Sequence, residues 1–179
     1  VFYEGGIPLK NVKKLTYMAM FTALITIVTM ISIKIPVTNG GYVHLGDSMI
    51  YIASVMLGPV YGMIVAGIGS MLADILLGAA NYAPFTLIIK ALMGLVCGLI
   101  AYRSLTTKKF ILGSAAGGLI MLIGYFLTEY LFMGNFVFPG IQLAFNSLQL
   151  VFGVIAGFLI YLALKKVSKK ELNHFFDEE

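Results

Sequence analysis

Four polar side chains stand inside long apolar segments of this sequence: Lys90, Glu129, Asn146 and Gln149. Pro84 suits the first turn of a helix, where its missing N–H costs nothing, so Lys90 is expected about six residues, or roughly 9 Å, inside that helix. A lysine at membrane depth costs on the order of 3 kcal/mol on insertion scales, so an ionisable residue there marks a candidate functional site. Counting from the expected helix ends places the other three in the same layer, roughly 6 to 12 Å below one surface.

Helical spacing puts several of these residues on common faces, and the connectors at the same surface add polar and aromatic side chains. Gln142 and Gly153 fall on the face of Asn146 and Gln149, while Thr86 falls on the face of Lys90. A polar layer under such connectors predicts a pocket open to one side of the membrane. The candidate substrate-binding residues are Asn39, His44, Asn81, Tyr82, Lys90, Tyr125, Glu129, Asn146 and Gln149.

The chemistry of this set predicts a small, uncharged or zwitterionic ring compound as ligand. Lys90 and Glu129 leave little net charge, provided that Asp74, which falls in the same layer, points away or is neutralised. Two amides supply both donors and acceptors for ring substituents. Tyr82 or Tyr125 is expected to pack on the face of the ring.

Structural roles compete with ligand binding for the same residues. Lys90 and Glu129 could form an ion pair within the bundle, and the amides could join helices through hydrogen bonds. Asp47 could be an N-terminal cap or a first-turn acid favoured by the helix dipole, and His44, on a connector, could be solvated. Four polar residues at one depth on three helices favour the pocket.

Composition defines the class of protein. At 60% hydrophobic and 11% charged residues, with a mean hydropathy of +0.97, the 179 residues have too little polar surface for a soluble globule. The net charge of +4 comes from short basic clusters rather than from a basic stripe, so nucleic acid is not an expected partner. A single cysteine, Cys97, excludes an internal disulfide.

The apolar segments predict an all-α integral membrane protein, a bundle of six transmembrane helices forming one domain over residues 1–179. The spans are expected at about 12–35, 45–63, 64–78, 84–103, 109–134 and 140–166, followed by a short cytoplasmic tail. Ten of the twelve basic residues then fall on one side: Lys10, Lys13, Lys14, Arg103, Lys108, Lys109, Lys165, Lys166, Lys169 and Lys170. The positive-inside rule predicts that this side, with both termini, is cytoplasmic.

Motifs for catalysis and nucleotide binding are absent from the sequence. There is no G-x-x-x-x-G-K-[ST], no H-E-x-x-H and no G-x-S-x-G, and the acidic residues and His44 lack metal-ligand spacing. The chain is therefore expected to be no enzyme and to hold no metal or cofactor. Uphill transport would then need energy from partner chains, or from an ion gradient if the chain is a stand-alone ion-coupled carrier using Glu129 and Lys90 as its relay.

Several motifs in this order resemble the substrate-binding S components of energy-coupling factor (ECF) vitamin transporters. They are Ala19-xxx-Ala23, Gly41-Tyr-Val-His-Leu-Gly-Asp47, Met56-Leu-Gly-Pro-Val-Tyr-Gly62, Ala73-Asp-Ile-Leu-Leu-Gly78 and Tyr82-Ala-Pro84. The resemblance implies a prokaryotic plasma-membrane importer in which Ala19 and Ala23 dock onto a transmembrane coupling subunit, the T component. Two partner ATPase subunits would hold ATP and Mg. The details are most similar to members for pyridoxine or hydroxymethylpyrimidine.

Overall fold

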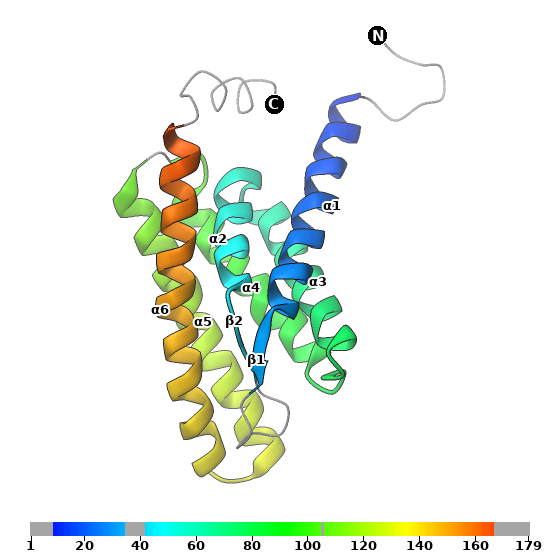
Figure 1. The fold of residues 1–179 in the computed structure, drawn as a ribbon, viewed down its shortest axis with the longest axis vertical. Coiled ribbons are helices and arrows are strands. Elements are labelled where there is room, and N and C mark those ends of the chain that lie inside the picture. Colours follow the sequence, from blue (N-terminus) through cyan, green and yellow to red (C-terminus); the bar gives the residue numbers. More distant parts are fainter. Residues whose placement is uncertain (1–8, 35–41, 105, 167–179) are drawn as a thin grey trace.

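The structure is a computed structural model that describes residues 9–34, 42–104 and 106–166. These residues form six helices and two short strands in one bundle (Figure 1). The elements are α1 (Leu9–Met30), β1 (Ser32–Lys34), β2 (Tyr42–His44), α2 (Gly46–Leu57), α3 (Pro59–Leu76), α4 (Ala83–Ala101), α5 (Thr107–Met133) and α6 (Val137–Lys166).

The helices confirm the predicted class of helical membrane protein. Five of them, α1, α3, α4, α5 and α6, are long and apolar enough to cross a bilayer. The remaining helix, α2, has only 12 residues, and all of them except Met49 and Met56 are buried. Because α2 lies inside the bundle between α1, α3, α4 and α6, the six-span path stays a prediction.

The boundary between the second and third helices differs from the expected one at residues 63 and 64. The chain breaks at Gly58, whose φ of +87° is a conformation that side chains rarely adopt. Pro59 then starts α3, because its fixed φ and missing N–H suit a first helical position. A Cβ at residue 58 would also lie 3.1 Å from the Tyr102 ring, so the turn needs glycine for space as well.

A two-stranded hairpin replaces the last turn expected for the first helix, which ends at Met30 rather than near residue 35. β1 and β2 pair antiparallel in the register Ser32 with His44, Ile33 with Val43 and Lys34 with Tyr42. The hairpin lies below the end of α1 and the start of α2, toward the end of the bundle where α6 begins (Figure 1). It carries two side chains, those of Tyr42 and His44, to the buried polar layer.

Glycines let α3 and α4 approach closely along their length. A Cβ at Gly94 would lie 2.7 Å from the Gly62 carbonyl oxygen, and one at Gly67 would lie 2.8 Å from the Leu87 carbonyl oxygen. This close packing is the small-residue pattern typical of membrane helices. It fixes Asp74 near the end of α3 and Thr86 near the start of α4 on the same side of the bundle, facing the start of α6.

Candidate functional site

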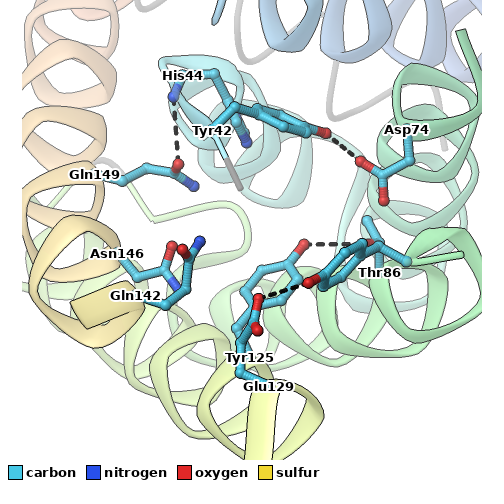
Figure 2. A pocket seen from close by; sticks show the side chains of 10 residues that line it. Tyr42, His44, Asp74, Thr86, Tyr125, Glu129, Gln142, Asn146 and Gln149 are labelled. Atoms are coloured by element: carbon cyan, nitrogen blue, oxygen red, sulfur yellow. Dashed lines mark hydrogen bonds between the residues drawn. The ribbon is translucent and has the colours of Figure 1, made fainter. Parts of the chain in front are cut away.

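A pocket occupies the half of the bundle that contains the hairpin, away from the Lys166 end of α6. Its empty volume, including the open space at its mouth, is about 390 Å³. Its lining comes from β2, α3, α5, α6 and the start of α4 (Figure 2). The lining residues are Tyr42, His44, Asp74, Tyr82, Thr86, Tyr125, Glu129, Gln142, Asn146 and Gln149.

One face of α6 supplies three amides to this pocket. Gln142, Asn146 and Gln149 are 6%, 3% and 2% exposed, as expected for residues at helical spacing on a buried face. Gly153, on the same face, lets α6 approach α2, since a Cβ there would lie 3.2 Å from the Cβ of Asp47. The predicted face is therefore present, and Gly153 allows the C-terminal continuation of this face to contact α2.

Lys90 does not line the pocket. Its side chain is fully buried, with Nζ 2.5 Å from Oδ1 of Asp47 and 3.1 Å from the sulfur of Met121. The ion pair considered between Lys90 and Glu129 is thus wrong, because Asp47 in the first turn of α2 is the partner. Asp47 lies in the first turn of α2, as the helix-dipole interpretation expected, but it makes no side-chain cap, and its ion-pair partner is Lys90.

Gln149 connects this ion pair to the hairpin. Its Nε2 donates to Oδ2 of Asp47 at 2.9 Å, and its Oε1 accepts from the backbone N–H of His44 at 3.3 Å. We call Asp47, Lys90 and Gln149 the polar junction. Every polar end group in the junction has a protein partner, so its charges are compensated without a ligand.

His44 is buried rather than solvated, contrary to the alternative considered for it. Its ring Nδ1 accepts from the backbone N–H of Gly46 at 3.0 Å, and the residue is 7% exposed. Burial lowers its pKa from 6.5 to about 4, with a smaller opposing effect from Asp47 and a further lowering by Lys90. At neutral pH the imidazole is therefore uncharged.

Two carboxylates face the pocket, and each receives one tyrosine hydroxyl. Tyr42 donates to Oδ1 of Asp74, and Tyr82 donates to Oε1 of Glu129 at 2.8 Å. Burial, assisted by the neighbouring carboxylate, raises the pKa of both tyrosines above the usual value, so both hydroxyls stay protonated donors. The remaining hydroxyls of the lining, those of Thr86 and Tyr125, are 3.1 Å apart and share a hydrogen bond.

Three buried polar atoms in the lining have no hydrogen-bond partner among the described residues. They are Oδ2 of Asp74, Oε1 of Gln142 and Nδ2 of Asn146. An unsatisfied buried polar group costs about 1 to 3 kcal/mol, so each orphaned atom in a native structure needs an explanation. A ligand in the pocket can supply the missing partners, and this is what distinguishes the pocket from the polar junction.

The structure places most of the candidate residues in the lining. Lining residues among them are His44, Tyr82, Tyr125, Glu129, Asn146 and Gln149. Asn81 is exposed and outside the lining, Lys90 lies in the junction, and Asn39 lies outside the described residues. Ala19 and Ala23 are both exposed on α1, away from the pocket lining.

Four lining residues were absent from the candidate set: Tyr42, Asp74, Thr86 and Gln142. Helical spacing already put Gln142 and Thr86 on the correct faces, and depth put Asp74 in the correct layer. Tyr42 reaches the pocket through the hairpin, for which three-residue strands give too short a pattern to recognise.

A bundle of apolar helices with a polar pocket among its described residues is typical of a membrane protein that handles a small solute. The chain belongs to the family of the ECF-type riboflavin transporter, S component, whose match covers residues 9–166. The resemblance drawn from the sequence motifs is thereby confirmed. Because this family consists of transporter components, the prediction that the chain is not an enzyme is confirmed too.

Individual proteins are also similar to this chain in sequence or in fold. The thiamine precursor transporter HmpT of Lactococcus lactis subsp. cremoris is 35% identical over 126 residues, which cover 70% of this chain and 72% of HmpT. An uncharacterized protein of Pyrococcus woesei is 35% identical over 146 residues, covering 79% of this chain and 95% of its own length. The solved S component of a bacterial ECF transporter has the same fold, with a TM-score of 0.72 and 23% identity over 89% of this chain and 99% of its own.

Membership of the family sets the chain's general role. The chain is a multi-pass membrane protein and the S component of an ECF-type importer. S components of this family act with T and ATPase components and take a small vitamin as substrate. The pocket is the part of the described structure that matches this role.

Proposed function

We propose that this chain captures a small vitamin or vitamin precursor, similar to pyridoxine or hydroxymethylpyrimidine, and delivers it through an ATP-driven complex. The observation that carries the proposal is the set of three unpartnered polar atoms in one buried pocket: Asp74 Oδ2, Gln142 Oε1 and Asn146 Nδ2. They come from α3 and α6, on two sides of the same pocket, so one compact polar ring could supply their missing partners (Figure 2). The relation to a thiamine precursor transporter supports the same size of solute.

We infer the direction of capture from charge. The basic residues that the positive-inside rule places in the cytoplasm include Lys165 and Lys166, at the far end of α6 from the pocket. With that end in the cytoplasm, the pocket opens to the outside of a prokaryotic plasma membrane. The substrate would then enter beside the hairpin.

The proposed partners are a T component and two ATPase subunits. Ala19 and Ala23 support a docking role on α1, because they are one helical turn apart, small and exposed, so that a partner helix can approach closely. Bulky substitutions at either position should stop uptake by the full complex and leave ligand binding by the isolated chain intact. Loss of binding would instead assign these alanines to internal packing.

The test of the proposed function is uptake of labelled hydroxymethylpyrimidine and pyridoxine into proteoliposomes. One set contains this chain with its T and ATPase components and ATP inside, a second contains inactive ATPase variants, and a third contains the chain alone under proton and sodium gradients. Uptake only in the first set is the expected result. Gradient-driven uptake in the third set would identify a stand-alone ion-coupled carrier.

A further inference from the structure

The pocket has two chemically different sides. Asp74 of α3 stands on one side, and the α6 amides of Gln142, Asn146 and Gln149 stand on the other, with Glu129 between them (Figure 2). A ligand between these sides meets carboxylate acceptors at one edge and amides at the opposite edge. Such an arrangement can select a ring by its orientation as well as by its size.

The second carboxylate oxygen of Asp74 has no hydrogen-bond partner among the described residues. Oδ1 accepts from Tyr42, but Oδ2 is buried without a partner. The nearby hydroxyl of Thr86 is hydrogen-bonded to Tyr125, and the hydroxyl of Tyr82 donates to Glu129. Because a carboxylate can accept several hydrogen bonds, Asp74 keeps acceptor capacity that a ligand donor can use.

The charge balance of the lining favours the same kind of ligand. The described lining holds two carboxylates and neither lysine nor arginine, and its one histidine is uncharged because its pKa is about 4. The closest buried cation, Lys90, is already paired with Asp47. An anionic ligand would therefore be buried without a counter-charge, whereas an N–H donor meets a matching acceptor.

On the opposite side of the pocket, two of the three amides are available to bind a ligand. Gln149 uses its oxygen for His44 and its nitrogen for Asp47, so it is held by the protein. Gln142 and Asn146 each retain one unpartnered amide atom. An amide pair of this kind can accept from a hydroxyl and donate to a ring nitrogen.

We propose that the pocket selects a nitrogen heteroaromatic ring bearing an exocyclic amino group, which donates to Oδ2 of Asp74. The opposite edge of the ring, with its nitrogen or hydroxyl substituent, faces Gln142 and Asn146. This assignment makes Asp74 the specificity-determining residue, and it rests on the proposed function. It narrows the substrate class from any compact vitamin to an aminated ring and excludes phosphorylated forms.

The test is calorimetric titration of the purified chain in detergent with a matched pair of hydroxymethylpyrimidines. One compound carries the amino group and the other carries an oxo group at the same ring position. A charge-assisted hydrogen bond lost from a buried site corresponds to roughly 10- to 100-fold in affinity, and we expect the amino compound to bind tighter by that factor. Equal binding, or tighter binding of the oxo compound, would overturn the proposal.

Two variants assign the preference to its residue. The Asp74→Asn side chain can still accept from Tyr42, but it adds a donor on the ligand side. The preference for the amino compound over the oxo compound should therefore fall at least about tenfold. Gln142→Ala should weaken the binding of both compounds and leave the ratio of their affinities unchanged. Ser114→Ala removes a buried hydroxyl from α5 outside the pocket lining and should bind both compounds as the parent does. If Asp74→Asn does not fold, the ratio of the affinities for the amino and oxo compounds, measured in the parent and in Gln142→Ala, tests the proposal.

Two further ligands separate this proposal from the proposed function. Tight binding of pyridoxine or riboflavin without binding of either pyrimidine would overturn the amino-group selection and leave vitamin capture standing. Absence of binding and of complex-dependent uptake for all four compounds would overturn both. Preference for the amino compound together with uptake only in the ATP-driven complex supports both.

Discussion

The polar junction and the pocket lie next to each other and share Gln149, but they differ in how their polar atoms are satisfied. The end groups of Asp47, Lys90 and Gln149 are all paired with protein atoms. The pocket leaves three atoms, on Asp74, Gln142 and Asn146, without partners in the part of the chain that the structure describes. We therefore expect the ligand to bind where buried polar atoms around the pocket lack partners, and not at the paired charges of the junction.

The largest expected effect is on stability, from breaking the junction. Lys90→Met leaves Asp47 buried without its counter-charge, which should lower the free energy of unfolding by about 3 to 5 kcal/mol. Denaturant unfolding in detergent measures it. The matched control is Lys90→Met with Asp47→Asn, which removes both charges and keeps an acceptor for Gln149. The double variant should recover most of the loss, and a single variant as stable as the parent would show that the pair is not a structural element.

The next effect is a pH dependence that arises from His44 in the hairpin. The unfolded chain gains a proton on this residue as the pH falls through 6.5, but the folded chain gains it only near pH 4. Stability should therefore decrease from about pH 6.5 to pH 4, by roughly 3 kcal/mol in total from this group. Thermal unfolding across this range measures it, with His44→Gln as the control. An equally steep decrease in the control would assign the dependence to other groups.

Smaller changes are expected from the pocket, and these should appear in binding rather than in stability. Asn146→Ala removes an amide whose Nδ2 has no protein partner, so the free energy of unfolding should change by less than about 1 kcal/mol. Ligand affinity should fall by about 5- to 150-fold, equivalent to roughly 1 to 3 kcal/mol. Calorimetric titration and unfolding on the same preparation measure both. A variant that loses stability and keeps affinity would place Asn146 with the junction.

The smallest effect is expected at the mouth of the pocket. Tyr82→Phe removes the hydrogen bond to Glu129 and keeps the edge-to-face contact with Phe132, whose ring centroid lies 5.2 Å away. Because Tyr82 is only partly buried, water can replace the lost donor. The free energy of ligand binding should therefore become less favourable by only about 0.5 to 1.5 kcal/mol. Ligand titration measures this change. A loss as large as that for Asn146→Ala would make Tyr82 a principal ligand contact.

The difference between junction and pocket also explains what the sequence could predict. Depth along a helix follows from residue counting, so Lys90, Glu129, Asn146 and Gln149 were correctly placed in one buried layer. Direction around the bundle depends on how helices pack, and only the fold brings Asp47 to Lys90 across 43 residues of sequence. The polar residues were therefore identified, but Lys90 was assigned to the pocket instead of the junction.

The hairpin and the α2–α3 break show the same limit on fold prediction. Long apolar segments predicted the membrane helices, because length and hydropathy are local properties. The three-residue strands depend on pairing between Ser32–Lys34 and Tyr42–His44, which no local pattern encodes. Gly58-Pro59 was a visible turn signal inside an apolar segment, and the structure places the boundary between α2 and α3 at this dipeptide.

The most direct measurement of the central claim is ligand affinity in two double variants compared with the parent. Lys90→Met with Asp47→Asn alters the junction, and Gln142→Ala with Asn146→Ala alters the pocket. Titration with the amino-substituted hydroxymethylpyrimidine should give an affinity within about threefold of the parent for the junction variant. The pocket variant should lose at least about 25-fold, since two ligand contacts are removed. Strong binding by the pocket variant together with loss of binding by the junction variant would contradict the account.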